Sequence, residues 1–253
     1  MPSEFSEGTF IFREMGKGNT LKTKPQNRFR MLSRLFGKVL IWFFALTIFW
    51  VMICRFINPP VTYLMIQRGI ERKIDGKDWK IEKSWLTIDE ISDNLKRAAI
   101  AGEDSRFMQH WGFDMEALEK AIVKNRKGKR VIGGSTISQQ TAKNVFLWPG
   151  RSYIRKGFEA YFTVLIELLW GKKRILEVYL NVIEMGDGIY GAEAASQKYY
   201  GRSAKNISRQ QAALLVAVLP NPIRWSPARP TSYIYYKQGL ILSNMRRLGK
   251  LPF

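Results

Sequence analysis

The feature that most constrains this chain is an uninterrupted apolar segment near its N-terminus. From Val39 to Cys54 the sequence reads VLIWFFALTIFWVMIC, sixteen residues without a charge. A helix needs about 20 mostly apolar residues to cross a bilayer. Arg55 can extend its guanidinium to the lipid headgroups, and the uncharged residues after it lengthen the segment as far as Arg68. A buried core helix would carry a polar face, whereas this run offers only Thr47. The segment therefore predicts a membrane-spanning helix.

The flanks of this segment predict the orientation of the chain. No small-x-small cleavage site follows the run, which favours an uncleaved signal anchor over a signal peptide. Residues 1–38 hold eight basic and three acidic residues, and such flanks stay in the cytoplasm. We therefore expect a basic, disordered cytoplasmic tail over 1–38, a single-pass anchor over 39–58 and an outer domain over 59–253.

The composition narrows the range of partners and cofactors. With 41 basic and 21 acidic residues the net charge is +20, which points to nucleic acid, anionic lipid or a phosphorylated substrate. Because the basic domain is predicted to lie on the outer side of the membrane, away from the cytoplasm, no nucleic acid is expected as a partner. A single cysteine and a single histidine rule out an intramolecular disulfide and argue against a zinc or iron–sulfur site.

The outer domain has the patterns of a helical protein. Apolar residues recur at helical intervals, and capping signals precede several of these runs. No series of alternating strands is present. The fold class is therefore predicted as all-α, with room for one short hairpin. Helices are expected over 87–100, after Asp114, and over 156–170, 174–185 and 208–220.

The first chemical cluster is GEDSRFMQHWGFD, residues 102–114. Glu103 and Asp104 follow an apolar helix directly. A carboxylate at such a junction between core and surface can have a raised pKa and accept a proton. The alternative is that the two carboxylates pair with Arg106 and His110 on the surface.

The second cluster is GGSTISQQTAKN, residues 133–144. A capped surface helix explains two of its polar residues, but not the amide and cationic groups in the next two turns. Such a set suits an oxygen-rich ligand such as a sugar or pyrophosphate. The candidate binding residues are Ser135, Thr136, Gln139, Gln140, Lys143 and Asn144.

The third cluster is RSYIRKGFEAYF, residues 151–162. It contains Arg151, Arg155 and Lys156, and Glu159 follows at the start of an apolar helix. Glu159 could pair with Arg155 at i+4 or interact with the helix dipole. Its functional interpretation requires a second carboxylate, for which Glu103 is the candidate.

These clusters resemble the peptidoglycan glycosyltransferases, and among them the monofunctional biosynthetic transglycosylases. The similarity covers roughly residues 80–230 and has five or more ordered motifs. Beyond the E-D-x-x-F-x-x-H-x-G, G-G-S-T-I-x-Q-Q-x-x-K-N and R-K-x-x-E patterns, it includes KKRILEVYLN, MGDGIYGAEAA and AALLVAVLPNP. The resemblance implies a lysozyme-like, mostly helical domain at the bacterial cytoplasmic (inner) membrane, with the catalytic part on the periplasmic side.

The resemblance also implies a mechanism. Lipid II is expected to serve as donor and acceptor, with Glu103 as the base for the attacking 4-hydroxyl. Lys143 and Arg151, together with Arg155, would stabilise the departing pyrophosphate, and Glu159 would organise that site directly or through Mg²⁺ or Mn²⁺. No cofactor is otherwise required, and no metal ligand is assigned. A single displacement gives a β-1,4 linkage. The donor side would be lined by Ser135, Thr136, Gln139, Gln140 and Asn144.

Several alternatives stay open at this point. Asp104 either orients Glu103 or contacts substrate. A lytic transglycosylase or muramidase would cleave the same polymer, but it needs no cations for pyrophosphate. A non-catalytic scaffold would have lost Glu103 or Glu159. The expected partners are membrane lipid and, in addition, proteins of cell-wall synthesis or division. Residues 61–66 and 146–150 either dip into lipid or pack in the core, and residues 124–130 are expected to form a mobile loop.

Overall fold

The computed structural model describes residues 25–126, 134–150 and 152–253 and divides into two units, the first ending at Leu46 and the second beginning at Thr47. The first unit contains most of helix α1 (Pro25–Phe56). This helix begins at Pro25, inside the segment 1–38 that is predicted as a disordered tail. A proline can occupy the first turn of a helix, because the N–H that it lacks would have no partner within the helix there. The tail up to residue 24 lies outside the described residues. Of the predicted loop 124–130, residues 127–130 also lie outside them.

The apolar part of α1 matches the prediction of a membrane anchor. Arg30–Phe56 is a stretch of 27 residues with a mean hydropathy of 2.2 in its most apolar window. At 1.5 Å per residue it is about 40 Å long, enough to span the hydrocarbon layer. Its length and composition are consistent with a single-pass anchor.

The second unit is mostly helical, which confirms the predicted fold class for the described residues. Its elements besides the end of α1 and three short strands are α2 (Tyr63–Ile74), the 3₁₀ turn η1 (Ile88–Glu90), α3 (Asp93–Glu103), α4 (Met115–Arg126), α5 (Ile137–Phe146), α6 (Tyr153–Leu169), α7 (Gly171–Val182), α8 (Ala192–Tyr200), α9 (Arg209–Ala217) and α10 (Ser232–Arg247).

A small sheet lies beside α8. β2 (Glu184–Gly186) and β3 (Ile189–Tyr190) form the predicted short hairpin, and β1 (Glu82–Lys83) pairs with β3 in parallel to give the order β1-β3-β2. Nothing in the sequence pattern predicted β1, because two residues are too short to show an alternation.

One predicted helix begins later than expected. The Thr87–Glu90 capping box is present, but it closes only η1, and Ile91 then takes an extended conformation. Ser92 provides a second cap by accepting a hydrogen bond from the Leu95 N–H, and α3 begins after it. The expected helix over 87–100 is therefore a 3₁₀ turn followed by α3.

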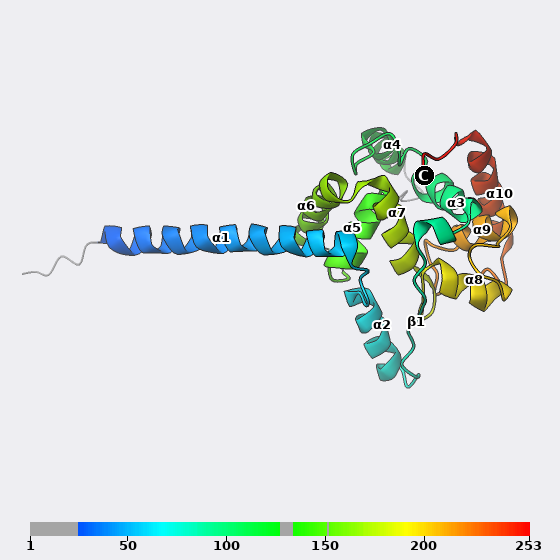
Figure 1. The fold of residues 1–253 in the computed structure, drawn as a ribbon, viewed down its shortest axis with the longest axis horizontal. Coiled ribbons are helices and arrows are strands. Elements are labelled where there is room, and N and C mark those ends of the chain that lie inside the picture. Colours follow the sequence, from blue (N-terminus) through cyan, green and yellow to red (C-terminus); the bar gives the residue numbers. More distant parts are fainter. Residues whose placement is uncertain (1–24, 127–133, 151) are drawn as a thin grey trace, which may run out of the picture. The chain divides into compact units, whose positions relative to one another are not determined.

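Two groups of helices pack around the core. α3 lies against α9 and α10, while α5 lies against α6 and α7 (Figure 1). Fully buried Leu95 and Ile100 belong to α3, Ile137 to α5 and Tyr179 to α7. The C-terminal end of α3 and the first turns of α5 meet where the two groups adjoin, and this junction carries the charged residues described next.

Candidate active site

Glu103 is the last residue of α3, and the glycine before it allows the helix to approach its neighbours closely. A Cβ atom on Gly102 would lie 2.6 Å from Val216 Cγ1 and 3.3 Å from Ile241 Cδ1. Any larger residue would push the end of α3 away from α9 and α10. Gly102 therefore helps to fix the position of Glu103.

Glu103 is half-buried, and among the described residues its carboxylate has one direct polar partner: Gln140 Nε2 donates to its Oε2 at 2.8 Å. Burial raises the pKa of Glu103, and this effect is opposed by the Gln140 hydrogen bond and by the positive charges of Lys237 and Lys143. A carboxylate with a raised pKa, still favoured in its ionised form by a donor and two cations, is suited to accept a proton.

Asp104 connects the end of α3 to the start of α5 through one oxygen and to the loop after α3 through the other. Its Oδ1 lies 2.9 Å from His110 Nε2, and its Oδ2 accepts the Ile137 N–H at 3.0 Å. The side chain is buried. Of the pairs considered as an alternative, the described residues contain Asp104–His110, which is buried, but no ion pair of Glu103. Arg106 pairs instead with Asp114 and Glu116. Both oxygens of Asp104 are therefore engaged by internal partners.

The first residues of the second cluster hold the start of α5. Thr136 Oγ1 accepts the Gln139 N–H at 3.2 Å, and Gln139 Oε1 accepts the Thr136 N–H at 3.0 Å. Thr136 also donates to the Gly112 carbonyl at 2.6 Å. Ser135 is exposed and, together with Glu103, lines a hollow of about 240 Å³.

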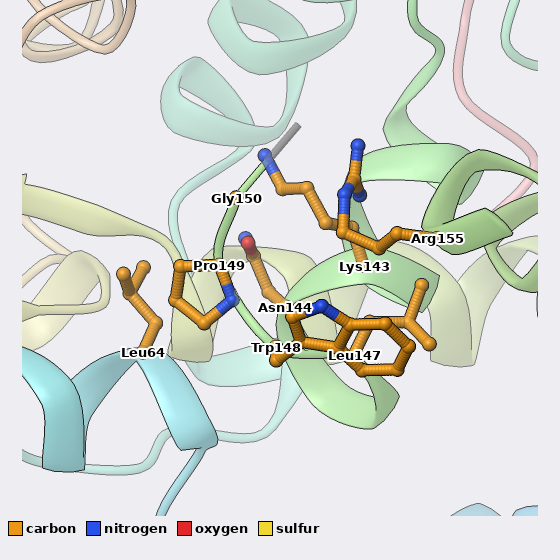
Figure 2. A pocket seen from close by; sticks show the side chains of 8 residues that line it. All are labelled: Leu64, Lys143, Asn144, Leu147, Trp148, Pro149, Gly150 and Arg155. Atoms are coloured by element: carbon orange, nitrogen blue, oxygen red, sulfur yellow. The ribbon is translucent and has the colours of Figure 1, made fainter. Parts of the chain in front are cut away.

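A second hollow of about 360 Å³ lies further along α5 and combines cationic and apolar walls. In Figure 2 the side chains of Lys143 and Arg155 extend to the same side of it, and the amide of Asn144 lies beside Pro149. Asn144 is buried, and its Nδ2 has no hydrogen-bond partner in the described part of the chain. The other lining residues are Leu64 of α2, and Leu147, Trp148 and Gly150 after α5.

Glu159 is buried beneath this second hollow and is paired with two cations of its own helix. Arg155 Nη1 donates to its Oε2 at 2.9 Å, and Lys156 Nζ donates to its Oε1. Burial lowers the pKa of Lys143, an effect that the Glu159 charge opposes. Lys143 interacts electrostatically with both Glu159 and Glu103. The predicted ligand Arg151 lies outside the described residues.

One group of described side chains has the spacing of a metal site. Ligand atoms of Asp104, His110 and Asp114 lie within 4.8 Å of one another. However, both oxygens of Asp104 have internal partners, and Asp114 accepts the Ala117 N–H and lies 3.6 Å from the Arg106 guanidinium. These contacts describe a hydrogen-bonded cluster that fixes the loop after α3, and they do not fit a divalent cation.

Two contributors to the site were absent from the sequence prediction. Asn244 of α10 lines the hollow at Glu103, and Lys237 of α10 acts on the Glu103 charge. Both lie more than 130 residues from Glu103 in the sequence. The helical spacing of Lys237, Ile241 and Asn244 on one face of α10 was the available signal.

Comparison with known proteins agrees with this geometry. The family model described as Transglycosylase matches residues 72–246. A biosynthetic peptidoglycan transglycosylase of Pseudomonas fluorescens strain Pf-5 is 51% identical over 220 residues, which is 87% of this chain and 92% of the relative. Proteins of the same name from Pseudomonas syringae pv. syringae and Pseudomonas putida are 51% and 48% identical over 218 residues, 86% of this chain and 92% of each relative.

Proposed function

Because this chain belongs to the transglycosylase family, we propose that it polymerises lipid II into linear β-1,4 glycan strands by inverting transfer, with release of undecaprenyl pyrophosphate. The coarser assignment follows from the matches: the chain is a peptidoglycan glycosyltransferase of mostly helical, lysozyme-like fold. The observation that carries the finer assignment is that α5 joins the Glu103 carboxylate, through Gln140, to a cationic hollow around Lys143.

Glu103 acts as the general base in this proposal. The 4-hydroxyl oxygen of the acceptor attacks C1 of the donor sugar while its proton passes to Glu103. The bond between C1 and the pyrophosphate oxygen breaks, and the electron pair leaves with the pyrophosphate. The Gln140 hydrogen bond and the nearby cations favour the ionised carboxylate that this step requires.

The leaving group is proposed to bind in the hollow between α5 and α6. Lys143 and Arg155 supply positive charge, the unpaired Nδ2 of Asn144 supplies a further donor, and Arg151 is assigned to the same group from its motif. Leu64 and Trp148 give the hollow an apolar side. A site with both properties suits a pyrophosphate that is attached to a lipid chain.

Glu159 is proposed to hold the cations of this site in place. Both of its oxygens already have cationic partners in Arg155 and Lys156, so protein side chains balance its charge. We assign no metal to the site and expect polymerisation to continue after removal of divalent cations by EDTA. A complete loss of activity that Mg²⁺ or Mn²⁺ restores would contradict this assignment.

The remaining predicted residues receive two kinds of role. Asp104, Thr136 and Gln139 are proposed to fix the start of α5 against the end of α3, as their internal hydrogen bonds suggest. Ser135 lines the hollow at Glu103, and Gln140 donates a hydrogen bond to the Glu103 carboxylate. Both residues are proposed to border the donor sugar. We place the catalytic unit on the outer face of the cytoplasmic membrane, because the basic flank precedes the apolar helix.

The alternative reading is cleavage of preformed glycan, for which the raised pKa of Glu103 would suit a general acid. Lytic chemistry gives no role to the cationic hollow.

The test is polymerisation of fluorescent lipid II by the full chain in proteoliposomes, comparing wild type with Glu103→Gln and with Glu119→Gln on the exposed side of α4. Long, muramidase-sensitive chains from wild type and from Glu119→Gln, with a loss of about 100-fold or more in Glu103→Gln, would support synthesis. Shortening of preformed glycan without polymerisation would establish the lytic reading.

A further inference from the structure

Helix α10 directs one of its faces toward the catalytic end of α3. Ile241 lies against the position of Gly102, and Asn244 Nδ2 donates to the Ala101 carbonyl at 3.3 Å. Lys237 precedes Ile241 by four residues and therefore occupies the same face one turn earlier. Its half-buried side chain is thus on the side of α10 that adjoins Glu103.

Two aromatic rings hold the Lys237 side chain. Its Nζ lies 5.7 Å from the ring centroid of Trp225 and 5.9 Å from that of Tyr233. The two rings are 5.5 Å apart and inclined at 56°. Cations are attracted to the faces of such rings, and this attraction limits the freedom of an otherwise flexible side chain. We call Trp225, Tyr233 and Lys237 the aromatic–lysine cluster.

We propose that Lys237, held by the aromatic–lysine cluster, is a positioning residue that keeps Glu103 ionised before the acceptor hydroxyl arrives. This inference rests on the proposed role of Glu103 as the base. It is supported by the electrostatic effect of Lys237, whose positive charge lowers the pKa of Glu103 against the dominant effect of burial.

The groups around Glu103 have separable tasks. Its own segment contributes the negative charge of Asp104, α5 contributes Gln140 and Lys143, and α7 contributes the buried hydroxyl of Tyr179. Lys143 also lines the hollow assigned to the leaving group and interacts with Glu159. A bound pyrophosphate would neutralise much of the Lys143 charge. Lys237 does not line that hollow, so its charge remains available to Glu103 while the donor is bound.

The experiment measures kcat, KM and their pH dependence for lipid II polymerisation by the full chain in detergent. Lys237→Met removes the charge and keeps much of the side-chain length, Lys237→Arg keeps the charge, and Lys198→Met removes an exposed charge on α8 as a matched control. Without the cation the ionised carboxylate is less stable, so its pKa rises and a higher pH is needed to deprotonate it. We expect the acidic limb of kcat/KM to move up by about 0.5–1 pH unit in Lys237→Met. Lys237→Arg and Lys198→Met should retain the wild-type limb.

The outcomes separate this role from others. A loss in Lys237→Met that is equal at every pH, or a rise in KM with an unchanged acidic limb, would overturn the proposal and make Lys237 a substrate contact. If Lys237→Met unfolds, Lys237→Gln is measured in its place, with thermal unfolding as the check on integrity. Full activity of Glu103→Gln would instead refute the proposed base, whatever the Lys237 variants do.

Discussion

Gln140 donates a hydrogen bond from Nε2 to Glu103 Oε2 at 2.8 Å, and its own Oε1 lies 3.5 Å from the hydroxyl of Tyr179. The buried tyrosine therefore helps to orient the amide so that its NH₂ group faces the carboxylate. Lys143 and Asn144 follow Gln140 by one helical turn. A single turn of α5 thus connects the proposed base to the proposed leaving-group site.

This relationship predicts a pH effect for Gln140→Leu. A hydrogen bond to a charged group contributes about 1.5–3 kcal/mol, and one pKa unit corresponds to about 1.4 kcal/mol. Loss of the donor destabilises the ionised carboxylate, so the acidic limb of kcat/KM should move up by about one to two pH units. Gln197→Leu on α8, whose side-chain amide donates to Glu193 of the same helix, is the control. An equal loss of activity at all pH values would show that Gln140 does not tune the ionisation of Glu103.

The Arg155–Glu159 pair predicts a difference between stability and activity. Both side chains are buried, and removing one partner of a buried ion pair costs about 3–5 kcal/mol because the other charge is left uncompensated. Glu159→Gln should therefore lower the free energy of unfolding and reduce polymerisation strongly. The double variant Arg155→Met/Glu159→Gln should recover part of the stability but none of the activity. Thermal unfolding and lipid II turnover check the two effects, and recovery of activity in the double variant would contradict the proposed role of Arg155.

Phe146 at the end of α5 and Trp148 just after it predict two distinct phenotypes, one for each of the alternatives, core packing and lipid contact, that the sequence left open. Phe146 is half-buried and stacked on Phe162, with centroids 4.7 Å apart and rings 10° from parallel, so it packs against the core. Trp148 is 42% exposed and lines the hollow around Lys143. Phe146→Ser should destabilise the fold, by less than the ~3–5 kcal/mol expected for a fully buried phenylalanine. Trp148→Ser should keep cooperative unfolding but weaken liposome binding and raise KM for lipid II; unchanged liposome binding and KM would remove Trp148 from the lipid site.

Close packing at Gly102 predicts a steric effect on catalysis. In Gly102→Ala the new methyl group would meet Val216 Cγ1 at 2.6 Å, and such overpacking costs about 1–3 kcal/mol. The end of α3 should shift, and kcat should fall together with stability. Gly239→Ala is the matched control, because no atom lies within 4 Å of its added Cβ. Since alanine is the better helix former, that variant should be neutral or slightly stabilised; wild-type kcat in Gly102→Ala would show that the glycine does not position Glu103.

Local signals predicted much of the fold correctly. The Ser208–Gln211 capping box starts α9, and Asp114 accepts the N–H of Ala117 at the start of α4. These devices act within four residues and can be recognised in the sequence. The Thr87–Glu90 box failed as a helix signal because Ser92, a few residues later, caps α3 instead.

Contacts between distant segments could not be predicted from such local signals. Thr136 and Gln139 share a motif with Lys143 and Asn144, yet they face inward to close the helix cap while the latter two line the leaving-group hollow. The sequence spacing does not distinguish these orientations. Helical spacing places Lys237 on one face of α10, but it does not show that this face lies toward Glu103. That orientation and the pairing of β1 with β3 both depend on how distant elements pack.

The packing of α10 against α3 also has a consequence for the time at which the enzyme becomes active. Glu103 is synthesised well before Lys237 and Asn244, which complete its surroundings from the far end of the domain. A nascent chain that lacks α10 would leave Gly102 without its Ile241 contact and Glu103 without one of its two nearby cations. Synthesis and packing of the last helix would therefore act as an assembly checkpoint that delays glycan polymerisation until the whole domain has folded.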